Sequence, residues 1–234
     1  MAGPGVLFDL DGTLVDTVYE QVAVWRRTLA TVGLDVAGWR IHRLLGRGFT
    51  DDTLREITAG SPRPLPELRA ALGPAYAAAV AQMGLEPRPV PGARALLGHL
   101  SRNAVPWGVV TGGQPGPSRA ALAALDALDA PLVTAADVCA GKPDPEMVLT
   151  AAAVLRVDPP AIIVVGDSVW DVRAARAAGA RGVAVLSGGT PRADLWDAGA
   201  SAVVDDVADL ARDLPAFGLP PLRAPERVDL TDRH

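Results

Sequence analysis

The sequence lacks the features that mark secreted and nucleic-acid-binding proteins. It contains a single cysteine, Cys139, so an internal disulfide cannot form and a reducing compartment is expected. With no His placed to activate it, Cys139 is expected to be a small buried residue. The chain's 22 Lys and Arg residues are outnumbered by 27 Asp and Glu residues, the net charge is −5, and no basic run occurs. Nucleic acid and anionic membrane surfaces are therefore poor candidates for partners.

Long apolar segments and histidine clusters are also missing. The longest clean apolar runs, such as 161–165, are far shorter than the ~20 residues that a membrane span requires. The opening Met-Ala-Gly-Pro-Gly has neither the basic start nor the apolar stretch of a signal peptide. His42, His99 and His234 show no metal-ligand spacing. We therefore expect a cytoplasmic protein without a membrane segment or a histidine-based metal site.

The composition is that of a globular protein. Hydrophobic residues make up 49% and charged residues 21% of the chain, which excludes general disorder. The 234 residues suffice for one large domain, or for one domain that carries an insert. We expect a monomer or a small homo-oligomer.

Hydrophobic periodicity divides the chain at two points. A buried strand is predicted at 5–8, and residues 17–87 then show only helical spacing, with helices expected at 18–32, 39–45, 50–58 and 65–83. Three prolines and a glycine at 87–92 form a connector that excludes helix. Beyond it, strands and helices alternate, which indicates a parallel sheet covered by helices on both faces.

The simplest organisation is one α/β domain with a helical insert after its first strand, and Trp25 and Trp39 are expected to pack within this insert. The core would be residues 1–16 and 88–234, the insert residues 17–87, and 215–234 a tail, because four prolines and little periodicity occur there. The expected core strands after the insert are 105–110, 132–134, 162–165, 182–186 and 202–204, and the expected helices are 93–100, 118–128, 145–155 and 169–178.

Polar residues follow several of these strands. Ligands of open parallel sheets bind beyond the carboxyl ends of the strands. There the sequence places four carboxylates, one hydroxyl and, in a neighbouring loop, one ammonium: Asp9, Asp11, Asp167, Asp171, Thr111 and Lys142. Four carboxylates in one small site need a cation or protonation, and an oxygen-only ligand set favours Mg²⁺. The hydroxyl of Thr111, the amides of Gly112 and Gly113, and Lys142 would suit a phosphate ester.

Four motifs occur in a fixed order. They are Asp9-Leu10-Asp11-Gly12-Thr13-Leu14-Val15-Asp16-Thr17, Thr111 after an apolar strand, Gly141-Lys142-Pro143-Asp144-Pro145, and Gly166-Asp167-Ser168-Val169-Trp170-Asp171. Together they resemble the motifs of the haloacid dehalogenase superfamily. The insert after the first motif resembles the small helical cap of the branch that contains phosphoglycolate phosphatase and β-phosphoglucomutase. The resemblance implies a Rossmann-like core and an all-helical cap.

The resemblance also implies roles for individual residues. Asp9 would be the nucleophile that forms an aspartyl-phosphate, and Asp11 the general acid and base. Thr111 and Lys142 would hold the transferring phosphoryl group. Asp9, Asp167, Asp171 and Asp11, the last through its backbone carbonyl, would belong to the Mg²⁺ site. Substrate contacts would come from the residues Thr111, Gly112, Gly113, Lys142 and Arg47.

Two activities remain open at this point. An acid at position 11 favours phosphoryl transfer over carbon–halogen hydrolysis, so we expect a phosphatase that acts on a small phosphorylated metabolite. The alternative is a phosphosugar mutase of the β-phosphoglucomutase type. That branch has a His in its first cap helix where this chain has Gln21, and its substrate loop resembles 46–52 without being identical. Both departures favour the phosphatase. A catalytically silent binding protein would require a missing catalytic position, and none is missing.

Overall fold

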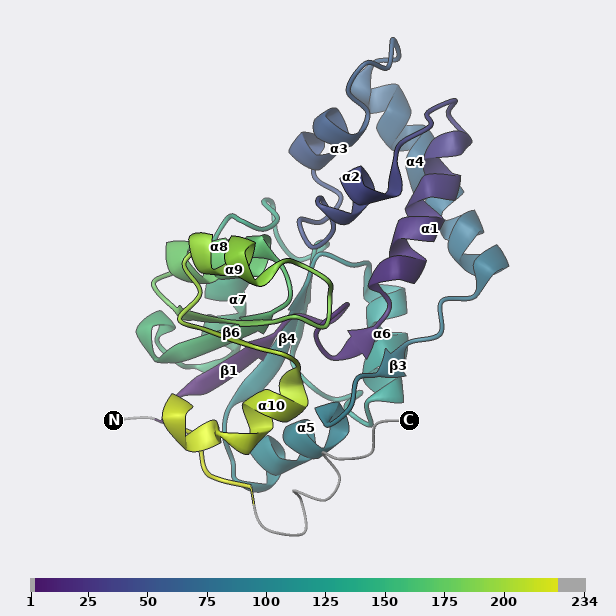
Figure 1. Ribbon diagram of the computed structural model, residues 1–234. Coiled ribbons are helices and arrows are strands. Elements are labelled where there is room, and N and C mark those ends of the chain that lie inside the picture. Colours follow the sequence, from purple (N-terminus) through teal and green to yellow (C-terminus); the bar gives the residue numbers. More distant parts are fainter. Residues whose placement is uncertain (1–2, 223–234) are drawn as a thin grey trace.

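Alternating strands and helices build a six-stranded parallel sheet in the computed structural model, which describes residues 3–222. The strands lie in the order β5-β4-β1-β6-β7-β8 (Figure 1). Their bounds are β1 Gly5–Phe8, β4 Trp107–Thr111, β5 Leu132–Thr134, β6 Ile162–Gly166, β7 Arg181–Val185 and β8 Ala202–Val204. The expected α/β class is confirmed.

Strand β1 is central, and its side chains show why both faces of the sheet are covered. Val6 and Phe8 belong to one hydrophobic cluster, whereas Leu7 belongs to the cluster on the opposite face. This alternation follows from the two-residue period of a strand. The helices on the two faces are α5 Ala93–Arg102, α6 Pro115–Ala124 and α10 Val207–Arg212 on one side, and α7 Glu146–Leu155 and α8 Val169–Ala177 on the other. Helix α9, Arg192–Asp197, packs at the β8 edge of the sheet.

Four helices intervene between β1 and β4 and have a hydrophobic cluster of their own. They are α1 Val18–Ala30, α2 Gly38–His42, α3 Asp51–Ile57 and α4 Leu65–Met83, and we call them the helical insert. Leu29, Ile41, Leu54 and Leu72 are completely buried among them. The insert lies beyond the carboxyl end of β1, at the upper right of Figure 1. Its position places a helical layer over the sheet edge where ligands of such folds bind.

Local sequence signals explain several helix ends. The Thr50 side chain accepts a hydrogen bond from the Thr53 amide, so it caps α3 as expected. Helix α4 has the predicted bounds and ends at Gly84, whose φ of 66° is left-handed. Helix α6 is different: we expected 118–128, but it spans Pro115–Ala124. Proline is tolerated in the first turn of a helix, where the amides lack intrahelical partners, so Pro115 can begin α6.

The sequence did not predict a short antiparallel ribbon between the insert and the sheet. Val15–Asp16 (β2) pairs with Arg88–Pro89 (β3), inside the proline-rich connector. The ribbon brings the two ends of the insert side by side, close to the end of β1.

Part of the expected tail instead packs on the core. Leu214–Phe217 forms a short 3₁₀ helix, and Leu219 and Leu222 are each only 5% exposed. The side chains of these leucines fill the cluster that α5 and α10 share, which explains why residues 215–222 are ordered against the sheet. Residues 223–234 lie outside the described part of the chain.

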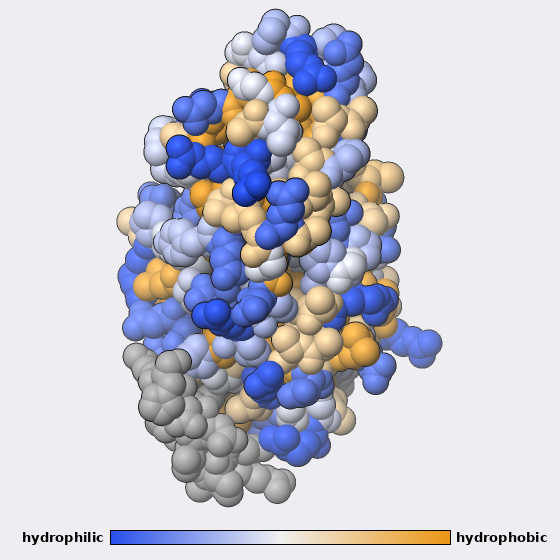
Figure 2. Space-filling view, turned by 90° about the vertical axis from the view of Figure 1, so that its right-hand side faces the viewer, coloured by the Kyte–Doolittle hydropathy of each residue, from blue (hydrophilic) through white to orange (hydrophobic). Residues whose placement is uncertain are grey.

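One face of the molecule mixes residue types. On the face that carries the insert, hydrophilic and hydrophobic residues are interspersed over both the insert and the sheet domain (Figure 2). Within residues 3–222, no helix has the combined length and apolar character needed to cross a bilayer.

Candidate active site

Three neighbouring strands end at one cavity. Asp9 follows β1 directly, Thr111 is the last residue of β4, and Asp167 follows β6 directly. Because β4, β1 and β6 are adjacent and parallel, these three side chains meet at the same edge of the sheet. They line a cavity of about 530 Å³ that extends into the helical insert. The structure therefore brings together the residues that the strand-end argument selected.

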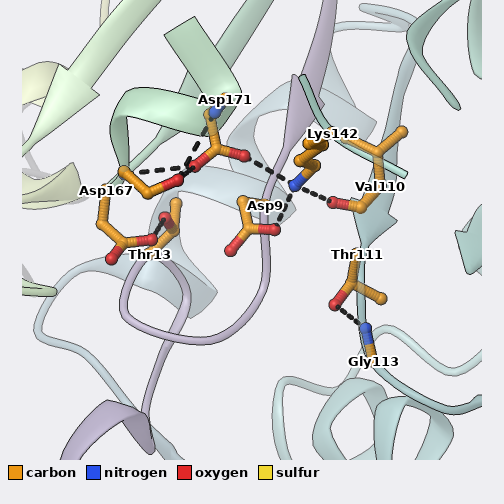
Figure 3. Close-up of polar contacts among 9 residues, drawn as sticks. Asp9, Thr13, Val110, Thr111, Gly113, Lys142, Asp167 and Asp171 are labelled. Atoms are coloured by element: carbon orange, nitrogen blue, oxygen red, sulfur yellow. Dashed lines mark hydrogen bonds and ion pairs between the residues drawn. The ribbon is translucent and has the colours of Figure 1, made fainter. Parts of the chain in front are cut away.

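Lys142 lies beneath this cavity and is only 1% exposed. Its Nζ donates to Asp9 Oδ1 at 2.5 Å, to Asp171 Oδ1 at 2.6 Å and to the Val110 carbonyl at 3.0 Å (Figure 3). These three acceptors satisfy all three N–H groups of an ammonium. Burial by itself lowers the pKa of Lys142, but the carboxylates of Asp171 and Asp9 raise it above its ordinary value. Lys142 is therefore a fixed positive charge under Asp9.

Asp171 is held by the start of α8. Ser168 is the N-cap residue of this helix, and Asp171 sits three residues later in a capping box. The Ser168 amide and hydroxyl both donate to Asp171 Oδ2, at 3.1 and 2.5 Å. With Oδ1 on Lys142, both oxygens of Asp171 are already engaged.

The acids near β1 and β6 form a candidate metal centre. One carboxylate oxygen from each of Asp9, Asp167 and Asp171 lies within 4.8 Å of the others, and all three residues are buried. Burial raises the pKa of Asp9 to about 7 despite the opposing effect of Lys142, and burial together with Asp9 and Asp171 raises the pKa of Asp167 well above its ordinary value. One ammonium does not neutralise three carboxylates. A divalent cation would lower these pKa values, and the oxygen-only donor set fits such an ion.

Asp11 faces away from that cluster. Its carboxylate is not a member of it and instead accepts hydrogen bonds from Thr17 Oγ1 and from the side chain of Gln21. Gln21 Oε1 in turn accepts from the Tyr76 hydroxyl at 2.6 Å. Burial raises the pKa of Asp11, and the bonds from Thr17 and Gln21 oppose that rise. Side chains of α1 and α4 therefore orient Asp11 at the cavity wall.

Thr111 and the two glycines after it form another part of the wall. The Gly113 amide donates to Thr111 Oγ1 at 3.0 Å, so the Thr111 hydroxyl keeps its own proton for another acceptor. Gly112 lies where the insert reaches the core: a Cβ at this position would be 2.7 Å from the Gly48 amide nitrogen. A Cβ on Gly141 would likewise meet the Arg47 carbonyl. Glycine at 112 and 141 thus lets loop 46–48 of the insert pack on the sheet domain.

Arg47, predicted to contact the substrate, is not among the residues that line the cavity. Its guanidinium pairs with Glu56 at 2.6 Å and lies 4.7 Å from the Trp170 ring centre. Loop 46–48 presents its backbone to Gly141 and Gly112, so the Arg47 side chain points elsewhere. Sequence alone could not give the direction of this loop.

Further expectations about single residues need correction. Cys139, expected to be buried, is exposed. Trp39, expected to pack within the insert, is 63% exposed. Trp25 does pack there, with its ring 4.8 Å from that of Tyr76, and it also lines the cavity.

Sequence reasoning missed the loop after β7. A Cβ on Gly188 would overlap the Asp167 carboxylate, and Ser187 Oγ donates to the Gly12 carbonyl at 2.6 Å. The Gly188 carbonyl also bonds His42 Nε2 of the insert, at 2.9 Å. The sequence signal that could have indicated this loop is the pair of consecutive glycines, Gly188 and Gly189, just beyond the end of β7.

Gly188→Ala should weaken binding of a divalent cation by about 10- to 100-fold, because the added methyl group displaces the Asp167 carboxylate. Titration calorimetry with MgCl₂ measures this change. Gly116→Ala is the matched control, since a Cβ there has no neighbour within 4 Å. Equal affinities in the two variants would contradict the placement of Asp167 in the metal centre.

Comparisons with known proteins agree with these motifs. The sequence model of the haloacid dehalogenase-like hydrolases matches residues 4–179. Validoxylamine A 7'-phosphate phosphatase of Streptomyces hygroscopicus subsp. limoneus is 35% identical over 175 residues, 74% of this chain and 81% of that protein. Phosphoglycolate phosphatase of Shigella boydii serotype 4 is 31% identical over 243 residues, covering 92% of this chain and 93% of that protein.

A solved structure is similar over nearly the whole chain. A hydrolase from Pseudomonas syringae superposes with a TM-score of 0.85 and 35% identity, over 91% of this chain and 98% of that one. With the family model matching well over half of the sequence, the chain belongs to the haloacid dehalogenase-like hydrolases.

Proposed function

We propose that the protein is a Mg²⁺-dependent phosphatase that hydrolyses a small phosphomonoester through an aspartyl-phosphate. The observation that carries this proposal is the arrangement of Asp9. Its Oδ1 is fixed by Lys142, its Oδ2 accepts no hydrogen bond from residues 3–222, and Asp9 and Asp11 line the same cavity. The names of the relatives above, both phosphatases, support the same reaction class.

In the first half-reaction, Asp9 Oδ2 attacks phosphorus and the bond from phosphorus to the ester oxygen breaks. Asp11 gives its proton to the departing alkoxide, which leaves as the alcohol. Its raised pKa favours the protonated form that this step needs. The Thr111 hydroxyl and the Lys142 ammonium stabilise negative charge on the phosphoryl oxygens and on Asp9.

In the second half-reaction, water attacks the phosphorus of the aspartyl-phosphate. Asp11, now a carboxylate, takes a proton from this water while the bond to Asp9 breaks. Inorganic phosphate is released and Asp9 is restored. The contacts of Asp11 with Thr17 and Gln21 keep its carboxylate in place for both proton transfers.

Mg²⁺ would be held by the carboxylates of Asp9 and Asp167 and by the Asp11 carbonyl. Bound there, it would supply positive charge to the phosphoryl oxygens. The engaged oxygens of Asp171 support a role for this residue in positioning Lys142 and the Asp167 loop.

We also propose that residues 17–87 are a cap domain over a catalytic core of 1–16 and 88–234. The separate hydrophobic cluster of the helical insert supports this division. The ribbon of β2 and β3 joins the two parts at their boundary. Movement of the cap would admit substrate and exclude water during transfer.

The mutase alternative is not favoured. A mutase must bind a second phosphate away from Asp9, but no Lys or Arg side chain from residues 3–222 lines the cavity. Gln21, at the position where the mutase branch has a His, is occupied with Asp11 and Tyr76.

Phosphate release from a panel of phosphomonoesters tests the proposal. We expect turnover with MgCl₂, none with EDTA, and recovery when excess MgCl₂ is restored. Asp9 has a pKa of about 7 without metal, so protons compete with Mg²⁺ below that pH and the apparent Mg²⁺ affinity should fall as the pH is lowered from 8 to 6. The Mg²⁺ concentration for half-maximal rate, measured at each pH, checks this. Full activity in EDTA would contradict the proposal.

A further inference from the structure

The part of the cavity formed by the helical insert is apolar and aromatic. Trp25 stacks with Phe49 at 5.3 Å between ring centres and meets Tyr76 in a tilted arrangement at 4.8 Å, and all three line the cavity. Aliphatic side chains from all four insert helices and the loop after α2 complete the wall, among them Val18, Ile41, Leu45, Leu54, Ile57 and Val80. Small residues at positions 73 and 77 of α4 leave the interior open. The volume of about 530 Å³ greatly exceeds what a two-carbon acid needs.

The charges that border this space are all of one sign. Among residues 3–222, the lining contains the acids Asp9, Asp11 and Asp167 but no Lys, Arg or His. Lys142 lies beneath Asp9 with its three N–H groups used. A carboxylate or second phosphate on the substrate would therefore lose its hydration without gaining a counterion, which is strongly unfavourable.

The nearest arginines of the insert are committed to other partners. Arg47 pairs with Glu56 and stacks on Trp170. Arg69 donates to the Phe49 carbonyl at 3.1 Å and pairs with Asp51. Neither side chain lines the cavity.

The polar groups of the wall are mostly paired with one another. The Tyr76 hydroxyl donates to Gln21, the Thr53 hydroxyl bonds that of Thr50 at 3.0 Å, and the Ser168 hydroxyl donates to Asp171. A substrate rich in hydroxyl groups would find few free partners here and would pay for their desolvation.

We infer that the substrate is a phosphomonoester of an uncharged, largely apolar alcohol, whose ring or chain packs against Trp25, Phe49 and Tyr76. This inference rests on the proposed phosphatase activity and specifies its substrate class. It sets the chain apart from an enzyme for phosphoglycolate, whose alcohol part carries a carboxylate.

Three esters with the same leaving geometry test it: cyclohexylmethyl phosphate, 4-carboxycyclohexylmethyl phosphate and glucose 6-phosphate. Each carries its phosphate on a CH₂ attached to a six-membered ring, so they differ in charge and polarity of the ring. We expect kcat/KM for the cyclohexylmethyl ester to exceed that of each of the other two by about 100-fold or more. p-Nitrophenyl phosphate, the fourth ester, reports whether the protein hydrolyses phosphomonoesters, independently of its preference among the three ring-bearing esters.

A charge introduced at the cavity rim gives a second readout. Gln114 is exposed, lines the cavity and makes no side-chain cap to α6. Gln114→Arg should raise kcat/KM for the carboxylated ester about tenfold relative to the neutral one. Ala123→Arg, on an exposed position of the same helix that does not line the cavity, should leave the ratio unchanged.

The outcomes separate the two proposals. Equal or better hydrolysis of the carboxylated ester or of glucose 6-phosphate overturns the substrate class while the phosphatase stands. Absence of phosphate release from all four esters, with MgCl₂ present, overturns the phosphatase and the substrate class with it.

Discussion

Asp9→Asn should reduce phosphate release by at least about 10⁴-fold, because an amide oxygen cannot form the phosphorylated intermediate. The variant should fold, since asparagine is nearly isosteric and its oxygen can still accept from Lys142. Burial raises the pKa of the Asp9 carboxyl to about 7, so above that pH the folded protein bears the cost of desolvating its negative charge. Asparagine carries no charge and removes this cost. Steady-state phosphate release and thermal unfolding, measured on the same preparations, check both expectations.

The control for Asp9→Asn is Asp16→Asn. Asp16 belongs to the same sequence motif but is exposed on strand β2. Its replacement should leave turnover within about twofold of the unchanged protein. A second readout is acid-stable incorporation of phosphate from a radiolabelled ester, which should be seen in the unchanged protein and lost in Asp9→Asn. Near-normal turnover of Asp9→Asn would exclude Asp9 as the nucleophile.

Lys142→Met should lower the free energy of unfolding by about 3–5 kcal/mol at pH 8 without metal, because Asp9 and Asp171 lose their buried counter-charge. Lys142 opposes the burial that raises the pKa of Asp9, so without the ammonium the pKa of Asp9 rises further in the folded state. Above about pH 4 the unfolded chain has released the protons of its carboxyls, whereas the folded variant still binds them at higher pH. Because the folded state binds more protons, the free energy of unfolding of the variant should increase as the pH falls. The deficit should therefore be smaller at pH 5.5 than at pH 8. Urea unfolding at the two pH values measures it.

The control for Lys142→Met is Arg88→Met, which breaks the exposed ion pair with Glu86 at 3.5 Å and should cost less than about 1 kcal/mol at either pH. Lys142→Arg provides a folded alternative if the methionine variant is too unstable to study. It retains the charge, but a planar guanidinium does not fit three acceptors arranged for an ammonium, so activity should fall while most stability remains. A pH-independent loss below about 1 kcal/mol in Lys142→Met would contradict the buried network.

The strand ends were the most predictable part of the site. Short apolar runs of β-branched residues gave β6 and β8 within a residue of their observed bounds. Since parallel strands share one carboxyl edge, the residues that follow them had to meet, and Asp9, Thr111 and Asp167 do so. Their chemical roles remain predictions.

The features that sequence could not supply depend on how separate segments face one another. The direction of the Arg47 side chain follows from the packing of loop 46–48 on Gly112 and Gly141, which lie far away in the chain. The link from Tyr76 through Gln21 to Asp11 requires the packing of α4 on α1. Leu219 and Leu222 are buried because a gap beside α5 accepts them, and no local periodicity marks that gap.

Lys142 has one more consequence, because it is the only lysine in the sequence; the other 21 basic residues are arginines. With that side chain 1% exposed, the folded protein presents no lysine amine to solvent. Acylating dyes, amine-reactive cross-linkers and enzymes that conjugate to lysine can therefore reach this side chain only when the core around Asp9 and Asp171 opens. In this protein, lysine modification is therefore a chemical reporter of the opening of the candidate active site.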